Sequence, residues 1–390
     1  MELTHEEEEI LNGRRGEELA KVLEVIVKVG EALEAKRLVN VTHAHISGIS
    51  YKNIGDAGLE FIEKLASSNL RVSIPATVNP AGMDIKKWRK MGVKQDFAEK
   101  QLRILGSLRK LGFKMLLTCT PYLYEKIPPG SQVAWAESNA VLYANSILNL
   151  YTNREGGPLA LLEAIVGKAP LYGYRLEENR RPGLVIDFSD IKRTIKEREL
   201  YQAIGYYVGT IAKFEVPLIK NYPSLLLQPD NVKLFLAAVG ASGSVALVRF
   251  HGEGGNLERY RPDIDDVYSA LPADFSDEGT ILMGCPHLSA REIRWLADIV
   301  KRWGKPKRRV IIFTARVLEN SMYKDIVALS RAGIEVYFDT CMVVADLKSM
   351  GVDKPLVDSA KAAYYLSSQG YDVGLFSRKD ILRVFYGDSV

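Results

Sequence analysis

The stretch Ile281-Leu282-Met283-Gly284-Cys285-Pro286-His287-Leu288-Ser289-Ala290-Arg291-Glu292 decides the fold class. Its first four residues are apolar or small and predict a strand that ends at Cys285. Ser289 and Glu292 have the spacing of a capping box, in which two side chains satisfy the backbone N–H groups that open a helix. A strand followed at once by a helix is the repeating unit of α/β proteins, so we expect an α/β fold.

The same alternation of strand and helix patterns runs through the N-terminal part of the chain. The predicted helices are residues 14–36, 56–67 and 95–111. The predicted strands are residues 38–41, 71–74 and 114–117. This order favours mostly parallel strands joined by crossover helices. The polar stretch 175–183 ends in Arg181-Pro182-Gly183, where we expect a boundary between lobes.

Composition and charge exclude several classes of protein. The chain has 390 residues, 47% of them hydrophobic and 26% charged, which is typical of a globular protein. Its 52 basic and 48 acidic residues are interleaved, so no nucleic-acid surface is indicated. No apolar run approaches the roughly 18 residues of a membrane span, and none opens the chain. We therefore expect a soluble cytoplasmic protein with neither nucleic acid nor membrane as a partner.

Three cysteines lie at the carboxyl ends of predicted strands: Cys119, Cys285 and Cys341. An odd number of cysteines does not indicate a disulfide framework. Ligands bind at the carboxyl ends of strands in open α/β sheets, so three thiols remote in sequence could meet there. Thiolates are the ligands of iron–sulfur clusters. Free cysteine also packs as a small apolar side chain, and placement alone favours three structural thiols.

A second metal site is consistent with the sequence. His43 and His45 follow the predicted strand 38–41, and side chains at i and i+2 share one face of a strand. Together with His251, His287 and an aspartate they would make a zinc hydrolase site. The ordinary alternative is one histidine at the edge of an active site and one held by hydrogen bonds.

Several loops suit an anionic ligand, although each is equally typical of a surface turn. Residues 47–50, 79–84 and 135–139 place small or polar groups next to predicted strands or helices. The glycine-rich stretch 240–244 fits a phosphate loop less well than a plain turn. Lys361 lies at a predicted helix start, where a lysine is usually solvated.

Taken together, these stretches resemble aconitase X, a branch of the aconitase superfamily, over essentially the whole chain. The matching motifs are THAHISG (42–48), TVNPAGMD (77–84), CTPY (119–122), AWAESNA (134–140), GCPH (284–287), DTC (339–341) and DSAK (358–361). The resemblance implies an aconitase-like, multi-lobed α/β/α architecture with mostly parallel sheets and a cluster site at the carboxyl ends of strands. It also implies that residues 1–390 form one catalytic region.

The resemblance assigns Cys119, Cys285 and Cys341 as ligands of an iron–sulfur cluster. A [4Fe-4S] cluster is the implied form, and loss of its labile iron would leave [3Fe-4S]. The wide spacing of these cysteines departs from ordinary aconitases, in which two ligands lie close together. The implied reaction is loss of water from (R)-5-phosphomevalonate, giving trans-anhydromevalonate 5-phosphate on an archaeal mevalonate route. An iron that carries no cysteine would bind the substrate hydroxyl as a Lewis acid.

The resemblance also implies six substrate contacts, which are Gly48, Ile49, Ser50, Asn79, Ser138 and Lys361. His45 and Glu137 are implied as neighbours of these contacts. The catalytic base of the family is a serine on a swivelling domain, which we expect on a separate small subunit rather than on this chain. Two further alternatives are the same machinery acting on cis-3-hydroxyproline, and a binding or scaffold subunit without chemistry.

Overall fold

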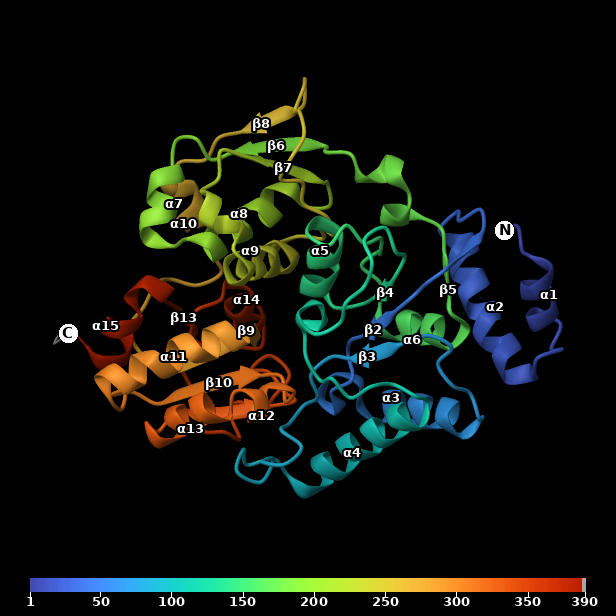
Figure 1. Ribbon diagram of the computed structural model, residues 1–390, viewed down its shortest axis with the longest axis horizontal. Helices are drawn as coiled ribbons and strands as arrows, with labels where there is room; N and C mark the ends of the chain where they lie inside the picture. Colours follow the sequence, from blue (N-terminus) through green and yellow to red (C-terminus); the bar gives the residue numbers. More distant parts are fainter. Residues whose placement is uncertain (388–390) are drawn as a thin grey trace. The chain divides into compact units, whose positions relative to one another are not determined.

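The computed structural model describes residues 1–387, which form two compact units (Figure 1). Unit 1 comprises residues 1–81 and 94–181, and unit 2 comprises residues 82–93 and 182–387. The lobe boundary predicted at Arg181-Pro182-Gly183 is confirmed. Each unit combines helices with mostly parallel strands, which confirms the α/β prediction. Among the described residues, no helix combines the length and the apolar character that crossing a membrane requires.

Unit 1 contains a small parallel sheet and a separate antiparallel pair of strands. Its helices are α1 (His5–Leu11), α2 (Glu17–Ala32), α3 (Tyr51–Ser67), α4 (Gln95–Lys110), α5 (Ser138–Ser146) and α6 (Gly157–Val166). Its strands are β1 (Leu38–Asn40), β2 (Ala44–Ile46), β3 (Ala76–Val78), β4 (Ala134–Trp135) and β5 (Lys168–Pro170). The parallel strands have the order β3-β2-β4, and β1 pairs with β5.

The helices predicted for unit 1 are confirmed, whereas its strands differ from the prediction. The chain around residues 38–46 forms β1 and β2 in two different sheets rather than one strand. The predicted strand 71–74 is wrong, because the strand begins after Pro75, at Ala76. Residues 114–117 run beside β3 without forming a strand, and Leu117 has a left-handed φ of 48°. The apolar run at residues 114–117 therefore indicates burial and not a strand.

Unit 2 contains two parallel sheets. Its helices are α7 (Lys192–Arg198), α8 (Tyr201–Ala212), α9 (Pro229–Ser242), α10 (Ile264–Ser269), α11 (Ala290–Trp303), α12 (Leu318–Ser321), α13 (Tyr323–Arg331), α14 (Ala360–Ser368) and α15 (Ile381–Tyr386). Its strands are β6 (Leu184–Asp187), β7 (Pro217–Lys220), β8 (Glu258–Tyr260), β9 (Thr280–Leu288), β10 (Val310–Thr314), β11 (Glu335–Phe338), β12 (Pro355–Val357) and β13 (Gly374–Leu375). The strand orders are β7-β6-β8 and β11-β10-β9-β12-β13.

The stretch 281–292 forms β9 and the start of α11, as predicted. Ser289 Oγ accepts a hydrogen bond from the Glu292 backbone N–H, and the Glu292 carboxylate accepts one from the Ser289 N–H, so the capping box is confirmed. The strand continues to Leu288, so Cys285 lies inside β9 rather than at its end. As the central strand of its sheet, β9 is buried from Ile281 onward, in keeping with its nearly continuous apolar sequence.

Helices α8 and α9 pack at unusually close range through glycines. A Cβ atom added at Gly205 would lie 2.3 Å from the Phe235 carbonyl oxygen, and one added at Gly209 would lie 2.4 Å from the Val239 carbonyl oxygen. Only glycine permits this approach of two helix backbones. The stretch 240–244 closes α9 at Ser242, so the plain turn is the correct interpretation.

Candidate functional site

The predicted substrate contacts of unit 1 lie along one edge of its parallel sheet. Gly48, Ile49 and Ser50 follow β2, Asn79 follows β3, and Ser138 follows β4 by three residues. Because these strands are parallel neighbours in the order β3-β2-β4, their carboxyl ends meet at the same edge. The sheet therefore brings together loops that are up to 90 residues apart in the sequence, which is about the separation of Gly48 and Ser138.

The loop after β2 is held by a buried glutamine that the sequence analysis missed. Gln101 Nε2 donates to the Ile49 carbonyl oxygen at 3.0 Å, and the Tyr51 N–H donates to Gln101 Oε1 at 3.0 Å. Gly48 has a left-handed φ of 69°, which lets the loop turn away from the strand. One sequence signal existed, since Gln101 is a polar residue on the otherwise apolar buried face of α4.

His45 connects two loops of this edge. Its Nδ1 lies 2.8 Å from Thr77 Oγ1, and its Nε2 lies 3.1 Å from Asn79 Oδ1. Burial lowers the pKa of His45 to about 3, so the ring is neutral at physiological pH. A neutral ring that donates from Nε2 holds the amide oxygen of Asn79 in place. His45 thus orients a predicted substrate contact.

Cys119 is held in the same unit by a side chain at the start of α5. Asn139 Nδ2 donates to the Cys119 carbonyl oxygen at 3.3 Å and to Tyr122 Oη at 2.8 Å. Within residues 1–387, the buried Oδ1 atom of Asn139 has no hydrogen-bond partner. Glu137 is the N-cap of α5, since its carboxylate accepts from the Ala140 N–H at 2.7 Å. Glu137 therefore sets the direction of the helix that carries Ser138 and Asn139.

The geometry does not support the zinc hydrolase. His43 Nδ1 accepts a hydrogen bond from Trp135 Nε1 at 3.1 Å, and both ring nitrogens of His45 have protein partners. His251 and His287 belong to unit 2. Across the described residues, no group of three or more His, Cys, Asp or Glu side chains is arranged to hold a metal ion. His43 and His45 are therefore structural, and burial also lowers the pKa of His43, to about 4.

The predicted site residues of unit 2 lie in or shortly after strands of one parallel sheet. Cys285 lies in β9, Cys341 follows β11, and Lys361 follows β12 at the start of α14. His287 Nε2 lies 2.8 Å from the Thr340 carbonyl oxygen, which ties the Cys285 segment to the Cys341 segment. The solvated position suggested for Lys361 is wrong, because its side chain is buried. A buried lysine at a sheet edge is suited to bind an anion.

A buried network of charged side chains links the segments that carry these residues. Glu292 forms ion pairs with Lys233 and Arg378, and Arg378 pairs in turn with Asp358. Lys233 Nζ also donates to the His287 carbonyl oxygen at 3.0 Å. Burial alone raises the pKa of Glu292, but the charges of Lys233 and Arg378 outweigh this effect and hold the pKa at about 2. The network joins the β9–α11 turn to the turn that precedes Lys361.

The three cysteines have the donor chemistry that an iron–sulfur cluster needs. All three are buried, and none forms a disulfide. Cys119 belongs to unit 1, and Cys285 and Cys341 belong to unit 2. Thiolate sulfur suits iron–sulfur clusters better than it suits a hard divalent cation. Within residues 1–387 these cysteines, like the histidines, form no group of three that could hold a metal ion, so their shared ligation of one cluster stays a prediction.

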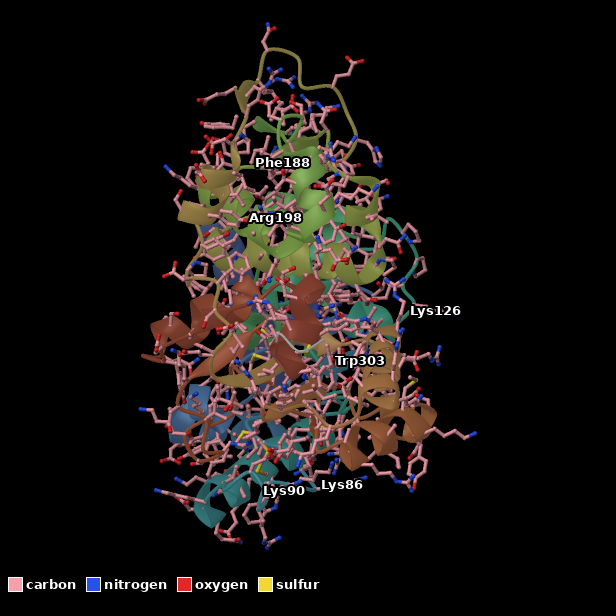
Figure 2. All side chains as sticks on the ribbon, turned by 90° about the vertical axis from the view of Figure 1, so that its left-hand side faces the viewer. Lys86, Lys90, Lys126, Phe188, Arg198 and Trp303 are labelled. Carbon is pink, nitrogen blue, oxygen red and sulfur yellow. The ribbon has the colours of Figure 1, made fainter. Side chains whose placement is uncertain are left out.

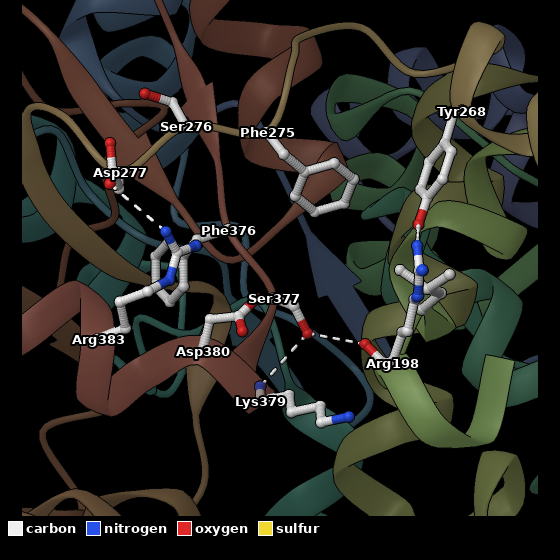
Figure 3. A pocket seen from close by; sticks show the side chains of 11 residues that line it. Arg198, Tyr268, Phe275, Ser276, Asp277, Phe376, Ser377, Lys379, Asp380 and Arg383 are labelled. Carbon is white, nitrogen blue, oxygen red and sulfur yellow. Dashed lines mark hydrogen bonds and ion pairs between the residues drawn. The ribbon is translucent and has the colours of Figure 1, made fainter. Parts of the chain in front are cut away.

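A well-formed cavity elsewhere in unit 2 contains none of the predicted residues. It has a volume of about 550 Å³, and its lining includes Arg198, Tyr268, Phe275 and Lys379 (Figure 3). Arg198 Nη1 donates to Tyr268 Oη at 3.0 Å, and Arg383 on the opposite wall pairs with an aspartate. Its cations are thus largely engaged, and in each unit the sheet edge remains the candidate.

Comparison with known proteins gives similarity along the whole chain. Models of the aconitase X first, second and third domains match residues 1–178, 182–269 and 279–386. The phosphomevalonate dehydratase large subunit of Methanocaldococcus jannaschii is 38% identical over 94% of this chain and 96% of its own length. The cis-3-hydroxy-L-proline dehydratase of Hypocrea jecorina is 29% identical over 94% of this chain and 65% of its own length.

A solved structure has the same fold. The crystal structure of Thermococcus kodakaraensis aconitase X in its holo form aligns with a TM-score of 0.87 at 35% sequence identity, covering 98% of this chain and 99% of that one. The aconitase-like architecture predicted from the sequence is therefore confirmed.

Proposed function

This chain belongs to the aconitase X family, and we propose that it is the large subunit of a dehydratase that removes water from (R)-5-phosphomevalonate. The product is trans-anhydromevalonate 5-phosphate, an intermediate of an archaeal mevalonate route to isoprenoid precursors. The observation that carries the proposal is the 38% identity to the Methanocaldococcus jannaschii large subunit along nearly all of both chains. The identity to a hydroxyproline dehydratase is lower, at 29%, and that relative is a longer protein.

We propose that the thiolates of Cys119, Cys285 and Cys341 hold one iron–sulfur cluster, with [4Fe-4S] as the working form and [3Fe-4S] as its iron-depleted form. Three ligands on four irons leave one iron without a cysteine. When bound, the cluster supplies a Lewis acid that makes the substrate hydroxyl a better leaving group. The burial of all three thiols supports the proposal, because it limits access of oxidants to the sulfur ligands.

The substrate carries negative charge at a phosphate and at a carboxylate, and the two sheet edges offer complementary groups. The backbone amides of residues 48–50 and the Ser50 hydroxyl would bind one anionic end. The buried ammonium group of Lys361 would neutralise the other. Two further side chains would bind the substrate. One is Asn79, which His45 orients, and the other is Ser138, which lies on the helix that Glu137 caps. These residues bind and orient, and none of them removes the proton.

We propose that the catalytic base is a serine on a separate small subunit, so the isolated chain should be nearly inactive. The base would take the proton next to the carboxylate, and that proton would leave with the hydroxyl as water. The relatives of this chain that are described as large subunits support the existence of such a partner. The small subunit is thus expected to complete the active site.

The decisive experiment is anaerobic reconstitution of the chain with iron, sulfide and a candidate small subunit, followed by assays of two substrates. We expect turnover of 5-phosphomevalonate, none of cis-3-hydroxy-L-proline, and broad absorbance near ~400 nm. Turnover of hydroxyproline alone would reject the proposed substrate. Full activity of the isolated chain would reject the partner serine, and a complex that binds iron and sulfide but converts neither acid would favour a scaffold role.

A further inference from the structure

Arg316 of unit 2 lies between two buried carboxylates that come from distant parts of the sequence. Its Nη2 donates to Asp84 Oδ1 at 2.7 Å, and its Nε donates to both oxygens of Asp339, at 2.9 and 2.7 Å. The side chains of Asp84 and Asp339 are 0% and 1% exposed. Arg316 Nη1 also donates to Glu319 Oε2 at 2.9 Å, which holds the guanidinium group from its outer side.

Asp339 sets the path of the chain into Cys341. Its φ of 62° lies in the left-handed region, which is uncommon for residues other than glycine and in which aspartate is enriched. This conformation turns the chain out of β11, two residues before Cys341. The guanidinium group of Arg316 binds the Asp339 carboxylate, and the Ile85 N–H donates to its Oδ2 atom at 3.2 Å. These contacts keep the turn in place.

Asp84 fixes the other side of the same turn. Its Oδ2 accepts from the Phe338 N–H at 2.9 Å, and its Oδ1 accepts from the N–H groups of Lys86 and Lys87 at 2.9 and 3.0 Å. The neighbouring Lys86 and Lys90 side chains project to the surface (Figure 2), whereas Asp84 is fully buried. The segment 82–93 is therefore anchored to the end of β11 through this carboxylate and Arg316.

The residue that follows Asp339 is anchored as well. The Thr340 carbonyl oxygen accepts from His287 Nε2 at 2.8 Å, two residues beyond Cys285. Two successive residues before Cys341 are thus held, one through its side chain and one through its backbone. The backbone sets the direction of the Cα–Cβ bond, so these contacts limit the positions that the Cys341 sulfur can take.

We propose that Arg316, with Asp84 and Asp339, is a positioning residue that aims the Cys341 sulfur for ligation of the cluster. The inference rests on the proposed function for its meaning, since it assigns a role toward the cluster. Arg316 acts by holding the left-handed turn at Asp339. Groups behind a metal ligand commonly change metal retention by 10–100-fold when they are removed.

The test compares Arg316→Lys with Arg309→Lys. Lysine keeps the charge of Arg316 but cannot contact two carboxylates as a planar fork. Arg309 is the matched control. Arg309 precedes β10 and Arg316 follows the same strand, and Arg309 pairs with Glu335 at 2.7 Å. In the reconstituted complex, the rate of iron loss to a chelator is measured. We expect loss about tenfold faster in Arg316→Lys and unchanged in Arg309→Lys.

A second measurement is independent of the cluster. In the iron-free chain under anaerobic conditions, alkylation of each cysteine by iodoacetamide is followed peptide by peptide. We expect a severalfold change in the rate at Cys341 in Arg316→Lys, with Cys119 and Cys285 unchanged. If the wild-type complex binds no iron, only the proposed function is rejected. The alkylation rates still test whether Arg316 positions Cys341.

Equal acceleration at all three cysteines would mean general loosening of the fold and would overturn the inference. So would unchanged alkylation at Cys341. If Arg316→Lys does not fold, Asp339→Asn takes its place, since asparagine tolerates the left-handed conformation but lacks the charge that Arg316 binds. The same selective change at Cys341 is then expected.

Discussion

The Nε2 atom of His45 lies 3.1 Å from the side-chain oxygen of Asn79. His45 lies on β2 and Asn79 follows the neighbouring strand β3, so this contact orients a residue that we propose binds the substrate. The imidazole is fully buried and neutral, so it works as a fixed hydrogen-bond donor and not as an acid or base. The same contact explains why a histidine lies in a position that suggested a metal site from sequence alone.

The first prediction concerns this contact. His45→Phe keeps the ring but removes the donor, so the Asn79 amide should rotate freely and lose part of its substrate interaction. We expect the KM for 5-phosphomevalonate in the complex to rise about tenfold, with kcat changed by less than about threefold. Combining His45→Phe with Asn79→Ala should add nothing to the effect of Asn79→Ala. Additive effects would show that His45 acts on another group.

The second prediction concerns the proposed cluster ligands. Cys119→Ser, Cys285→Ser and Cys341→Ser should each abolish the absorbance near ~400 nm and lower the iron and sulfide content after reconstitution, because a hydroxyl is a poor cluster ligand. Dehydratase activity should fall to background in all three. Retention of iron and of full activity in any one variant would assign that thiol to packing instead.

The third prediction concerns Lys361. Lys361→Met keeps a long apolar side chain but removes the buried charge, and kcat/KM should fall about 30-fold or more, corresponding to about 2 kcal/mol. Lys354→Met is the matched control, since Lys354 precedes β12 in the same unit and pairs at the surface with Glu278 at 3.1 Å. Equal loss in both variants would point to a general electrostatic effect.

The fourth prediction is a pH dependence of stability that arises from Glu292. Burial raises the pKa of Glu292, but the charges of Lys233 and Arg378 outweigh this effect and hold its folded-state pKa at about 2. The ordinary pKa is 4.5, so the folded state favours the ionised form. This contribution to the free energy of unfolding, about 3 kcal/mol, is fully present above pH ~4.5 and is lost as the pH falls toward 2.

Denaturant titrations of wild type and Glu292→Gln across this pH range test the fourth prediction. The stability difference between them should be constant from pH ~7 to ~5 and should shrink steadily as the pH is lowered. A difference that does not depend on pH would show that folding does not lower the pKa of Glu292. Glu292→Asp, which keeps the charge, should retain the pH dependence.

The fifth prediction concerns the link between Asn139 and Cys119. Asn139→Ala leaves the Cys119 carbonyl and the Tyr122 hydroxyl without their donor, and should lower the free energy of unfolding by about 1–3 kcal/mol. The matched control is Asn179→Ala, whose amide donates to the Gly173 carbonyl at 3.0 Å on an exposed surface. That variant should stay within about 0.5 kcal/mol of wild type.

Part of the candidate site followed from local sequence patterns. Strand β9 and the capping box at Ser289 and Glu292 were predicted because they depend on neighbours within four residues. The segment 114–117 was predicted wrongly because an apolar run reports burial, and the left-handed conformation of Leu117 leaves no pattern in the sequence. Gln101 was missed because its partners lie about 50 residues away.

The sequence by itself determined the alternation of strands and helices, the three thiols and the family motifs that contain them. Only the tertiary structure decided that Lys361 is buried, and that Arg316 joins Asp84 and Asp339 across 232 and 23 residues. The physical reason is the range of the forces involved. Hydrophobic periodicity and capping act between near neighbours, whereas a buried charge must find its partner wherever strand order brings one.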